Sequence, residues 1–464
     1  MKIKNLSKNQ KHAIILSSII LFVTVTVTVF FVWSASFKKL SNIRPLTEEQ
    51  SASLTAFLDN TYPLNRGTNL KPLPYPIVEA NLDVGAESAI LIDVSNGCIL
   101  FEKNADELIP PASITKLFVM YIAFKEIEEG SLSLDEYVQP PEMSWAINMP
   151  SDSSLMFLGQ GHKVTMKELL KGLAVASGND AALAVAYRIS GSTKAFVERM
   201  NYEAQALGLT NTHFEEPSGY SEKNITTAKE LAQFCRIYIN RFPESLSDYH
   251  SQKEIRYPKK ENLPSWQQDK GDSMAIYQKN TNPLLGVLEG CDGVKTGFIY
   301  ESGYNLALTC IRDNVRFLSI TMKGPGTGSK QGNFWRVKDG TTMMEWAFSS
   351  FADYRPWEHV AQRYTVPCPG AKSKFVNLVP AWTCSVTVPH IMAETALEDA
   401  SNVHAEISIP RYIFGGTTLG GIYGQIQYKL GDTVLETVPL VSDRMIKKAG
   451  LWGRFWGALV AFRL

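Results

Sequence analysis

The stretch Pro110–Lys116, which reads PPASITK, is followed at once by the apolar run Leu117–Phe124, LFVMYIAF. Proline suits the first positions of a helix, where a backbone N–H has no partner, so a helix is predicted to begin near the two prolines. This helix is apolar almost all round, which indicates burial in a domain core. Because residues three apart share one helix face, we expect the amine of Lys116 beside the hydroxyl of Ser113.

A serine next to a buried lysine can become a nucleophile without help from histidine. Burial favours the neutral amine, and a neutral amine can accept the proton of the serine hydroxyl. The S-x-x-K spacing is weak by itself, because about 2 chance copies are expected in a chain of this length. One such copy is Ser36–Lys39. Other features of the chain must therefore decide whether Ser113 is catalytic.

The composition excludes several classes of protein. The chain has 464 residues, enough for two or three domains, and 46 basic residues balance 46 acidic ones, so binding to nucleic acid is not expected. Six cysteines lack C-x-x-C spacing and seven histidines stand singly, so we expect no metal site and no cofactor. Cys368 and Cys384 are close enough in sequence to pair in an oxidising compartment, but buried free thiols are an equal alternative.

The N-terminal 36 residues are typical of an exported protein. No residue from Ala13 to Ala35 is charged, which is long enough to cross a bilayer, and four lysines precede this run. We interpret residues 1–36 as a retained membrane anchor or as a cleaved signal peptide, and both place the rest of the chain outside the cytoplasm. Residues 37–84, with prolines among polar residues, are predicted to be a linker.

The folded part is predicted to begin near Gly85 with a hairpin around Asn96-Gly97. Helices follow, and strands return near Val294, so residues 85–356 are predicted to form an α+β domain with an antiparallel sheet and helices. Residues 357–443 are predicted to form a small all-β domain. Residues 444–464 mix aromatic and basic side chains, which suits a segment lying at the membrane interface, although a buried terminal helix is the alternative.

Two further motifs follow Ser113 in chain order, Ser177-Gly178-Asn179 at a helix junction and Lys295-Thr296-Gly297 at a strand. The order S-x-x-K, S-x-N and K-T-G resembles the low-molecular-mass penicillin-binding proteins, the serine-type D-alanyl-D-alanine carboxypeptidases. The similarity runs from about Gly85 to Phe351 and includes PASITK, SGNDAA and DGVKTG. It implies a catalytic domain with the fold of β-lactamases and transpeptidases.

The resemblance also implies a role for each motif residue. Ser113 would attack the carbonyl between the last two D-alanines of a peptidoglycan stem peptide, with Lys116 as its base. Ser177 would carry a proton to the leaving amine. The substrate would be held by Asn179, Lys295, Thr296, Gly297 and Phe298, the last through its backbone N–H. The implied partners are this stem peptide, β-lactams as covalent inhibitors, and a membrane.

This chain also departs from the family pattern. Phe298-Ile299 stands where histidine and threonine are common, and Glu216–Tyr220 (EPSGY) stands where the family usually has N-P-x-G-L. Three rival functions remain at this point: an endopeptidase that cuts peptidoglycan cross-links, a β-lactamase that uses Glu215 or Glu216 for deacylation, and an inactive wall-binding scaffold.

Overall fold

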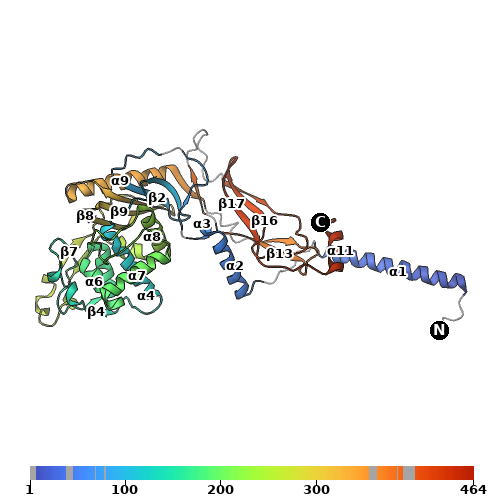
Figure 1. Cartoon of the computed structure of the whole chain (residues 1–464), viewed down its shortest axis with the longest axis horizontal. Helices are drawn as coiled ribbons and strands as arrows, with labels where there is room; N and C mark the ends of the chain where they lie inside the picture. Colours follow the sequence, from blue (N-terminus) through green and yellow to red (C-terminus); the bar gives the residue numbers. More distant parts are fainter. Residues whose placement is uncertain are drawn as a thin grey trace. The chain divides into compact units, whose positions relative to one another are not determined.

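The computed structural model describes residues 7–37, 45–67, 69–77, 80–354, 363–383, 385–389 and 403–464 (Figure 1). The chain divides into two compact units. The larger unit comprises Thr68–Tyr354 with Thr387–Ala400, and the smaller unit comprises Met1–Gly67, Arg355–Val386 and Ser401–Leu464. Each unit is described by itself below.

A six-stranded sheet is the centre of the larger unit, and it confirms the predicted hairpin and the predicted return of strands near Val294. Only the two-residue β1, parallel to β3, departs from the antiparallel pairing that was expected. Gly97 adopts a φ of 77°, which the tight turn between β2 and β3 requires. In order across the sheet, the strands are β1 (Lys71–Pro72), β3 (Cys98–Lys103), β2 (Ser88–Asp93), β10 (Val315–Gly324), β9 (Gly303–Arg312) and β8 (Cys291–Ile299).

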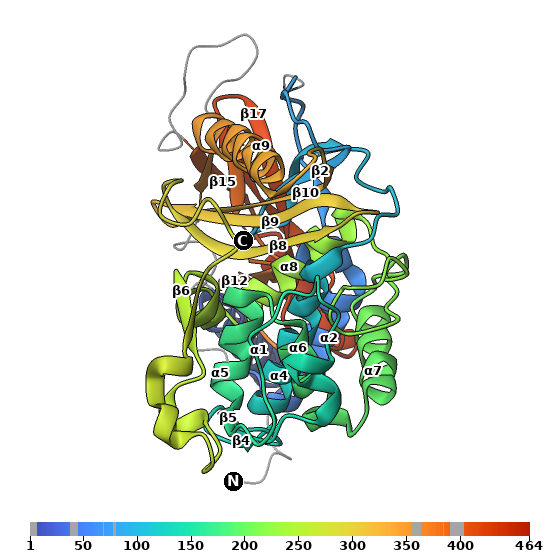
Figure 2. The same ribbon diagram turned by 90° about the vertical axis from the view of Figure 1, so that its left-hand side faces the viewer.

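Helices cover both faces of this sheet, so the unit has three layers (Figure 2). The long helix α9 (Ser329–Ser350) lies on one face, where Met343 and Met344 pack with Leu306 and Leu308 of β9. The other face carries a larger apolar core. The helices of that second face are α4 (Lys116–Glu128), α5 (Met166–Lys171), α6 (Asn179–Ser190), α7 (Thr193–Ala206) and α8 (Ala228–Arg241).

Helix α4 is the central helix of the larger core. A short 3₁₀ turn at Ala112–Thr115 precedes it, so the α-helix itself begins at Lys116 rather than at the two prolines. Its residues from Lys116 to Phe124 are all buried, as the apolar run predicts. The chain leaves the helix through Gly130, whose φ of 77° is the left-handed conformation common after helix ends.

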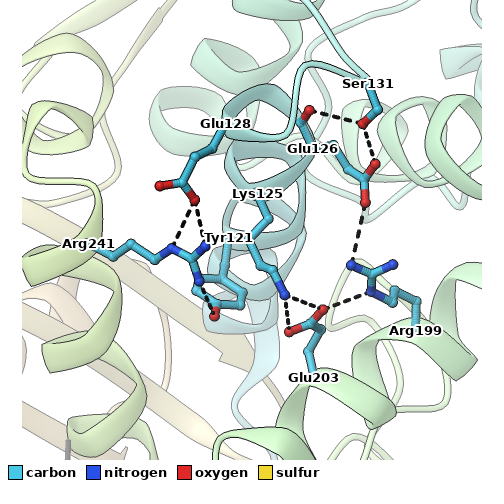
Figure 3. A network of polar contacts seen from close by, with 8 residues as sticks. All are labelled: Tyr121, Lys125, Glu126, Glu128, Ser131, Arg199, Glu203 and Arg241. Atoms are coloured by element: carbon cyan, nitrogen blue, oxygen red, sulfur yellow. Dashed lines mark hydrogen bonds and ion pairs between the residues drawn. The ribbon is translucent and has the colours of Figure 1, made fainter. Parts of the chain in front are cut away.

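Ionic contacts fasten the far end of α4 to its neighbours (Figure 3). Glu203 of α7 has a side chain that is only 2% exposed, and it accepts from Lys125 of α4 at 2.7 Å and from Arg199 at 2.8 Å. Glu128 pairs in the same region with Arg241 of α8. These pairs anchor the C-terminal end of α4, which is the end that lies away from Ser113.

The structure revises one of the sequence predictions, the linker at residues 37–84. The supposed linker contains helix α2 (Glu48–Thr61), whose start is a capping box formed by Thr47 and Gln50. Its buried Leu54 and Leu58 lie four residues apart on one face, a short pattern that the surrounding polar residues obscured. In the region 251–283, β6 (Glu254–Tyr257) pairs with β7 (Ile276–Lys279).

The smaller unit contains a five-stranded antiparallel sheet in the order β12, β13, β17, β16 and β15, which agrees with the predicted β-rich domain. Helix α1 (Lys8–Ala35) and helix α11 (Leu451–Ala461) belong to the same unit. Cys384 lies outside the described residues, so the choice between a pair with Cys368 and two free thiols is not tested. The strands are β12 (Tyr364–Pro367), β13 (Phe375–Pro380), β15 (Val403–Ser408), β16 (Ile422–Leu430) and β17 (Thr433–Ser442).

Candidate active site

Ser113 and Lys116 lie together at the start of α4, as the three-residue spacing predicts. The Nζ atom of Lys116 is 2.8 Å from Oγ of Ser113 and donates to the carbonyl of Ser218 at 2.5 Å. Lys116 is fully buried, and this desolvation lowers its pKa to about 7, although the carboxylates of Glu216 and Asp180 act in the opposite direction. A lysine with this pKa is half neutral near pH 7 and can accept a proton there.

Ser177 reaches the same site from the junction between α5 and α6. One π-helical turn, Gly172–Ala176, ends in Ser177, which adopts the left-handed conformation with a φ of 57°. Such strained conformations are often found at functional sites. Lys295 of β8 donates to Oγ of Ser177 at 2.9 Å, so the second and third motifs are joined directly.

Lys295 is also buried, with 1% of its surface exposed. Burial holds its pKa well below the usual range, and the neighbouring positive charges of Lys116 and Arg336 lower it further. An anionic group entering the site would relieve this repulsion. Thr296, the next residue, donates its hydroxyl to Thr281 at 2.7 Å.

Glycines allow the backbone to close around the nucleophile from two sides. A Cβ atom on Gly297 would lie 2.5 Å from the carbonyl oxygen of Pro111 and 3.2 Å from the backbone nitrogen of Ser113. A Cβ atom on Gly219, where φ is 81°, would lie 1.9 Å from the carbonyl oxygen of Ala112. Both positions therefore require glycine, and the edge of β8 lies directly against Ser113.

Two cavities meet at Ser113. The larger cavity has a volume of about 580 Å³, and the smaller one has about 320 Å³. The predicted residues Ser177, Thr296 and Gly297 line the larger cavity, and Asn179 lines the smaller one. Phe298 borders both cavities and stacks on Tyr304 with ring centroids 4.4 Å apart. Lys116 and Lys295 do not line either cavity, and both lie buried behind the cavity walls.

The structure reveals an arginine that sequence reasoning missed. Arg336 of α9 lines the larger cavity, where it donates to the carbonyls of Gly297 at 2.5 Å and Asn305 at 3.1 Å. Its guanidinium lies over the ring of Tyr304. Burial lowers its pKa only to about 10, so it keeps its positive charge near neutral pH. A single arginine in a helix gave no sequence signal, because only the fold brings α9 to β8.

Glu216, which the sequence offered as a deacylating base, is not a free carboxylate. It accepts from the backbone nitrogens of Ser218, Gly219 and Tyr220 at 2.7, 2.5 and 2.8 Å. The turn that supplies the carbonyl of Ser218 to Lys116 is therefore wrapped around this carboxylate. Glu215 and Glu216 do not line either cavity, which argues against their proposed use as a deacylating base.

His250 supports β8 from inside the core. Its Nδ1 atom is 3.0 Å from the carbonyl of Val294, and Nε2 is 2.8 Å from the hydroxyl of Tyr238. Burial and the nearby charge of Lys295 lower its pKa to about 3, so it stays neutral and donates from Nδ1. It holds the strand immediately before the K-T-G motif.

Comparison with known proteins supports the family resemblance that the three motifs indicate. Residues 76–326 match the D-alanyl-D-alanine carboxypeptidase family of S11 peptidases. The carboxypeptidase DacF of Bacillus subtilis is 31% identical over 79% of this chain and 87% of its own length, and DacC of Escherichia coli is 30% identical over 80% and 87%. The structure of penicillin binding protein 5 from Haemophilus influenzae is similar with a TM-score of 0.67 and 26% identity, covering 80% of this chain and all of that one. Motifs, fold and relatives agree, and the chain belongs to the D-alanyl-D-alanine carboxypeptidase family.

Proposed function

We propose that the protein is a serine DD-carboxypeptidase that removes the terminal D-alanine from peptidoglycan stem pentapeptides through an acyl-enzyme on Ser113. The observation that carries the proposal is the contact of Ser113 with a fully buried lysine at the junction of two cavities. Family membership supports the reaction, and the geometry supports the residue roles that follow.

In the acylation step, neutral Lys116 takes the proton of the Ser113 hydroxyl as Oγ attacks the carbonyl of the penultimate D-alanine. The backbone N–H groups of Ser113 and Phe298 stabilise the negative charge that develops on the carbonyl oxygen. The C–N bond then breaks, and the proton passes through Ser177 to the departing amine of the last D-alanine. The hydrogen bonds of Ser177 and Ser113 to buried lysines support this path.

In deacylation, water attacks the ester carbonyl and restores the Ser113 hydroxyl, and the shortened stem peptide leaves. The carboxylate of the terminal D-alanine fits the larger cavity, where Thr296 and Arg336 lie. The amine of Lys295 lies behind the cavity wall, and a bound carboxylate would favour its charged form. Asn179 would bind the peptide backbone on the acyl side. A β-lactam would acylate Ser113 by the same attack, with slow hydrolysis of the adduct.

The first test is mass spectrometry of the purified protein after mixing with benzylpenicillin, with the Ser113→Ala variant as control. A stable adduct on Ser113, followed by D-alanine release from a pentapeptide, would support the proposal. Rapid loss of the adduct as penicilloic acid would indicate a β-lactamase, and cleavage of cross-linked dimers alone would indicate an endopeptidase. Absence of any adduct would favour the scaffold hypothesis.

We further propose that the protein is tethered to the membrane with its catalytic unit outside the cytoplasm. Helix α1 is long and apolar enough to cross a bilayer. Near the C-terminal end of α1, the rings of Phe30 and of Trp456 in α11 have centroids 5.6 Å apart. The guanidinium of Arg463 donates to the hydroxyl of Ser34 at 2.8 Å. These contacts favour a retained anchor over a cleaved signal peptide, because cleavage would leave α11 without this partner.

The exposed side of α11 suits the membrane interface. Leu451, Trp452 and Phe455 are 83%, 77% and 56% exposed, and an apolar face of this kind is stabilised at the boundary of headgroups and acyl chains. Detection of an N-terminal peptide from the membrane-bound protein by mass spectrometry would support the anchor. A mature N-terminus beyond Ser36 would refute it.

A further inference from the structure

Two cysteines lie directly opposite each other in the central sheet. Cys291 of β8 and Cys310 of β9 are register partners in an antiparallel pair, and both are free thiols. The two strands lie side by side in the sheet (Figure 2). Residues opposed in this way have Cα atoms about 4.5 to 5.5 Å apart, within the range of about 4.4 to 6.8 Å that disulfides span. The backbone therefore already holds the two residues at a separation that suits a disulfide bond.

The two side chains also point to the same face of the sheet. Cys310 is part of the apolar core between the sheet and α9, and Cys291 packs against that core. Opposed residues of an antiparallel pair project from one side of the sheet, so their side chains meet. The thiol of Cys310 forms a hydrogen bond with the sulfur of Cys291. The contact that a disulfide would replace is therefore already present.

The two thiols differ in reactivity. Cys291 is partly exposed, whereas Cys310 is fully buried. The hydrogen bond from Cys310 holds the pKa of Cys291 below its usual value, although burial acts in the opposite direction. The same hydrogen bond and burial raise the pKa of Cys310. Because the thiolate is the nucleophile in disulfide exchange, Cys291 is the attacking thiol and Cys310 is the resolving thiol.

The pair lies at the open end of the hairpin that carries the third motif. The segment between the two cysteines contains residues 295–298 and the turn that joins β8 to β9. Neither cysteine lines the cavities at Ser113. A bond between Cys291 and Cys310 therefore fastens the hairpin without entering the site.

We propose that Cys291 and Cys310 are a redox modification site, at which a small disulfide oxidant outside the cytoplasm produces a cross-strand disulfide that closes the β8–β9 hairpin. The compartment rests on the proposed export of the catalytic unit, since disulfides form and persist in oxidising surroundings. The pairing rests only on the contacts of the two cysteines.

The reaction is two successive exchanges with an oxidant RSSR. The thiolate of Cys291 attacks one sulfur of RSSR, which forms a mixed disulfide and releases the first thiolate, RS⁻. Cys310 then loses its proton as its sulfur attacks the Sγ atom of Cys291, and the second RS⁻ leaves. The two cysteines lose two electrons, which reduce the oxidant, and their two protons pass to the departing thiolates to give two RSH.

The test treats the reduced, purified protein with oxidised glutathione under native conditions. Trypsin cleaves after Lys279, Lys295 and Arg312, so the two cysteines lie in separate peptides, 280–295 and 296–312. Without reductant these peptides should be found linked, with a mass about 2 Da below their sum because two hydrogen atoms are lost. Dithiothreitol should separate them.

Single variants separate the roles of the two thiols. Cys310→Ala removes the resolving thiol, so Cys291 should keep a glutathione adduct on peptide 280–295. Cys291→Ala removes the attacking thiol, and Cys310 should stay unmodified because it is buried. The matched control is Cys98→Ala, which changes a buried cysteine of β3 in the same sheet and should still give the linked peptides.

The disulfide should stabilise the catalytic unit and leave its chemistry intact. A closed loop restricts the unfolded chain, so the midpoint of thermal unfolding should rise by about 5 °C on oxidation. This rise should be absent from Cys291→Ala. The rate of Ser113 acylation by benzylpenicillin should be the same before and after oxidation, because neither cysteine lines the cavities.

Several outcomes would overturn the proposal. Linked peptides that form only after denaturation would show that the folded strands do not permit the bond. An unfolding midpoint that does not rise, or a loss of acylation on oxidation, would refute the stabilising role. Full alkylation of both thiols, when growing cells are lysed in denaturant with N-ethylmaleimide, would show that no oxidant reaches the pair. Failure of the proposed function is distinct, because absence of acylation in the reduced protein leaves the peptide map unchanged.

Discussion

Replacement of Glu216 by glutamine should shift the acid limb of Ser113 acylation to lower pH. Acylation requires neutral Lys116, so its rate rises with pH through the pKa of this lysine, which is about 7. The carboxylate of Glu216 favours the ammonium form and raises that pKa. Removal of the negative charge lowers the pKa, so a larger fraction of Lys116 is neutral in acid.

The magnitude follows from the contacts of one residue. Glu216 accepts from the backbone nitrogen of Ser218 at 2.7 Å, and Lys116 donates to the carbonyl of the same Ser218 at 2.5 Å. Standard backbone dimensions then place the two charges on the order of 6 Å apart. At an effective dielectric constant of about 20, this separation corresponds to about 3 kcal/mol, or ~2 pKa units as an upper value. We expect a shift of about 1 to 2 units.

The assay is the rate of acylation by benzylpenicillin, measured by intact-protein mass spectrometry across the acid and neutral range. Glu215→Gln is the matched control, because Glu215 is the adjacent carboxylate, 53% exposed, and pairs with His213 instead. Its acid limb should stay near pH 7. An acid limb that does not move in Glu216→Gln, or that moves to higher pH, would refute the reasoning that Glu216 sets the pKa of Lys116.

Two other substitutions test the packing around the nucleophile and the core beneath it. Gly219→Ala places a Cβ atom 1.9 Å from the carbonyl oxygen of Ala112, so the backbone before Ser113 must move. Acylation of Ser113 should therefore slow by about 100-fold. An unchanged rate would show that the turn accommodates the methyl group. Glu203→Ala leaves Lys125 and Arg199 without their partner, whose side chain is only 2% exposed. Urea unfolding should show that the free energy of unfolding falls by about 3 kcal/mol, while the folded protein is still acylated. A fall below ~1 kcal/mol would mean that solvent compensates both cations.

The sequence predicted the parts of the site that depend on short spacings. Ser113 and Lys116 meet because they lie one helical turn apart, and the prediction holds even though the first turn is 3₁₀ rather than α. The hairpin at Gly97 was predicted for the same reason, because its signal lies within a few neighbouring residues. The roles assigned to the motif residues remain proposals.

The parts that the sequence did not predict depend on tertiary contacts. Arg336 reaches the carbonyl of Gly297 from a helix that packs across the sheet, and no local pattern marks that approach. Glu216 was considered as a catalytic carboxylate, but the turn of Ser218–Tyr220 folds around it and satisfies its oxygens. The helix in residues 48–61 was missed because only two of its apolar residues, Leu54 and Leu58, are buried.

The burial of Lys116 also makes the activity of the enzyme depend on the pH around it. A protein outside the cytoplasm works at the pH of the medium, without the buffering of the cell interior. Since the pKa of Lys116 is about 7, each unit of external acidification below neutrality removes most of the remaining reactive base. Cells growing in acid should therefore trim fewer pentapeptides, and their walls should keep more terminal D-alanine.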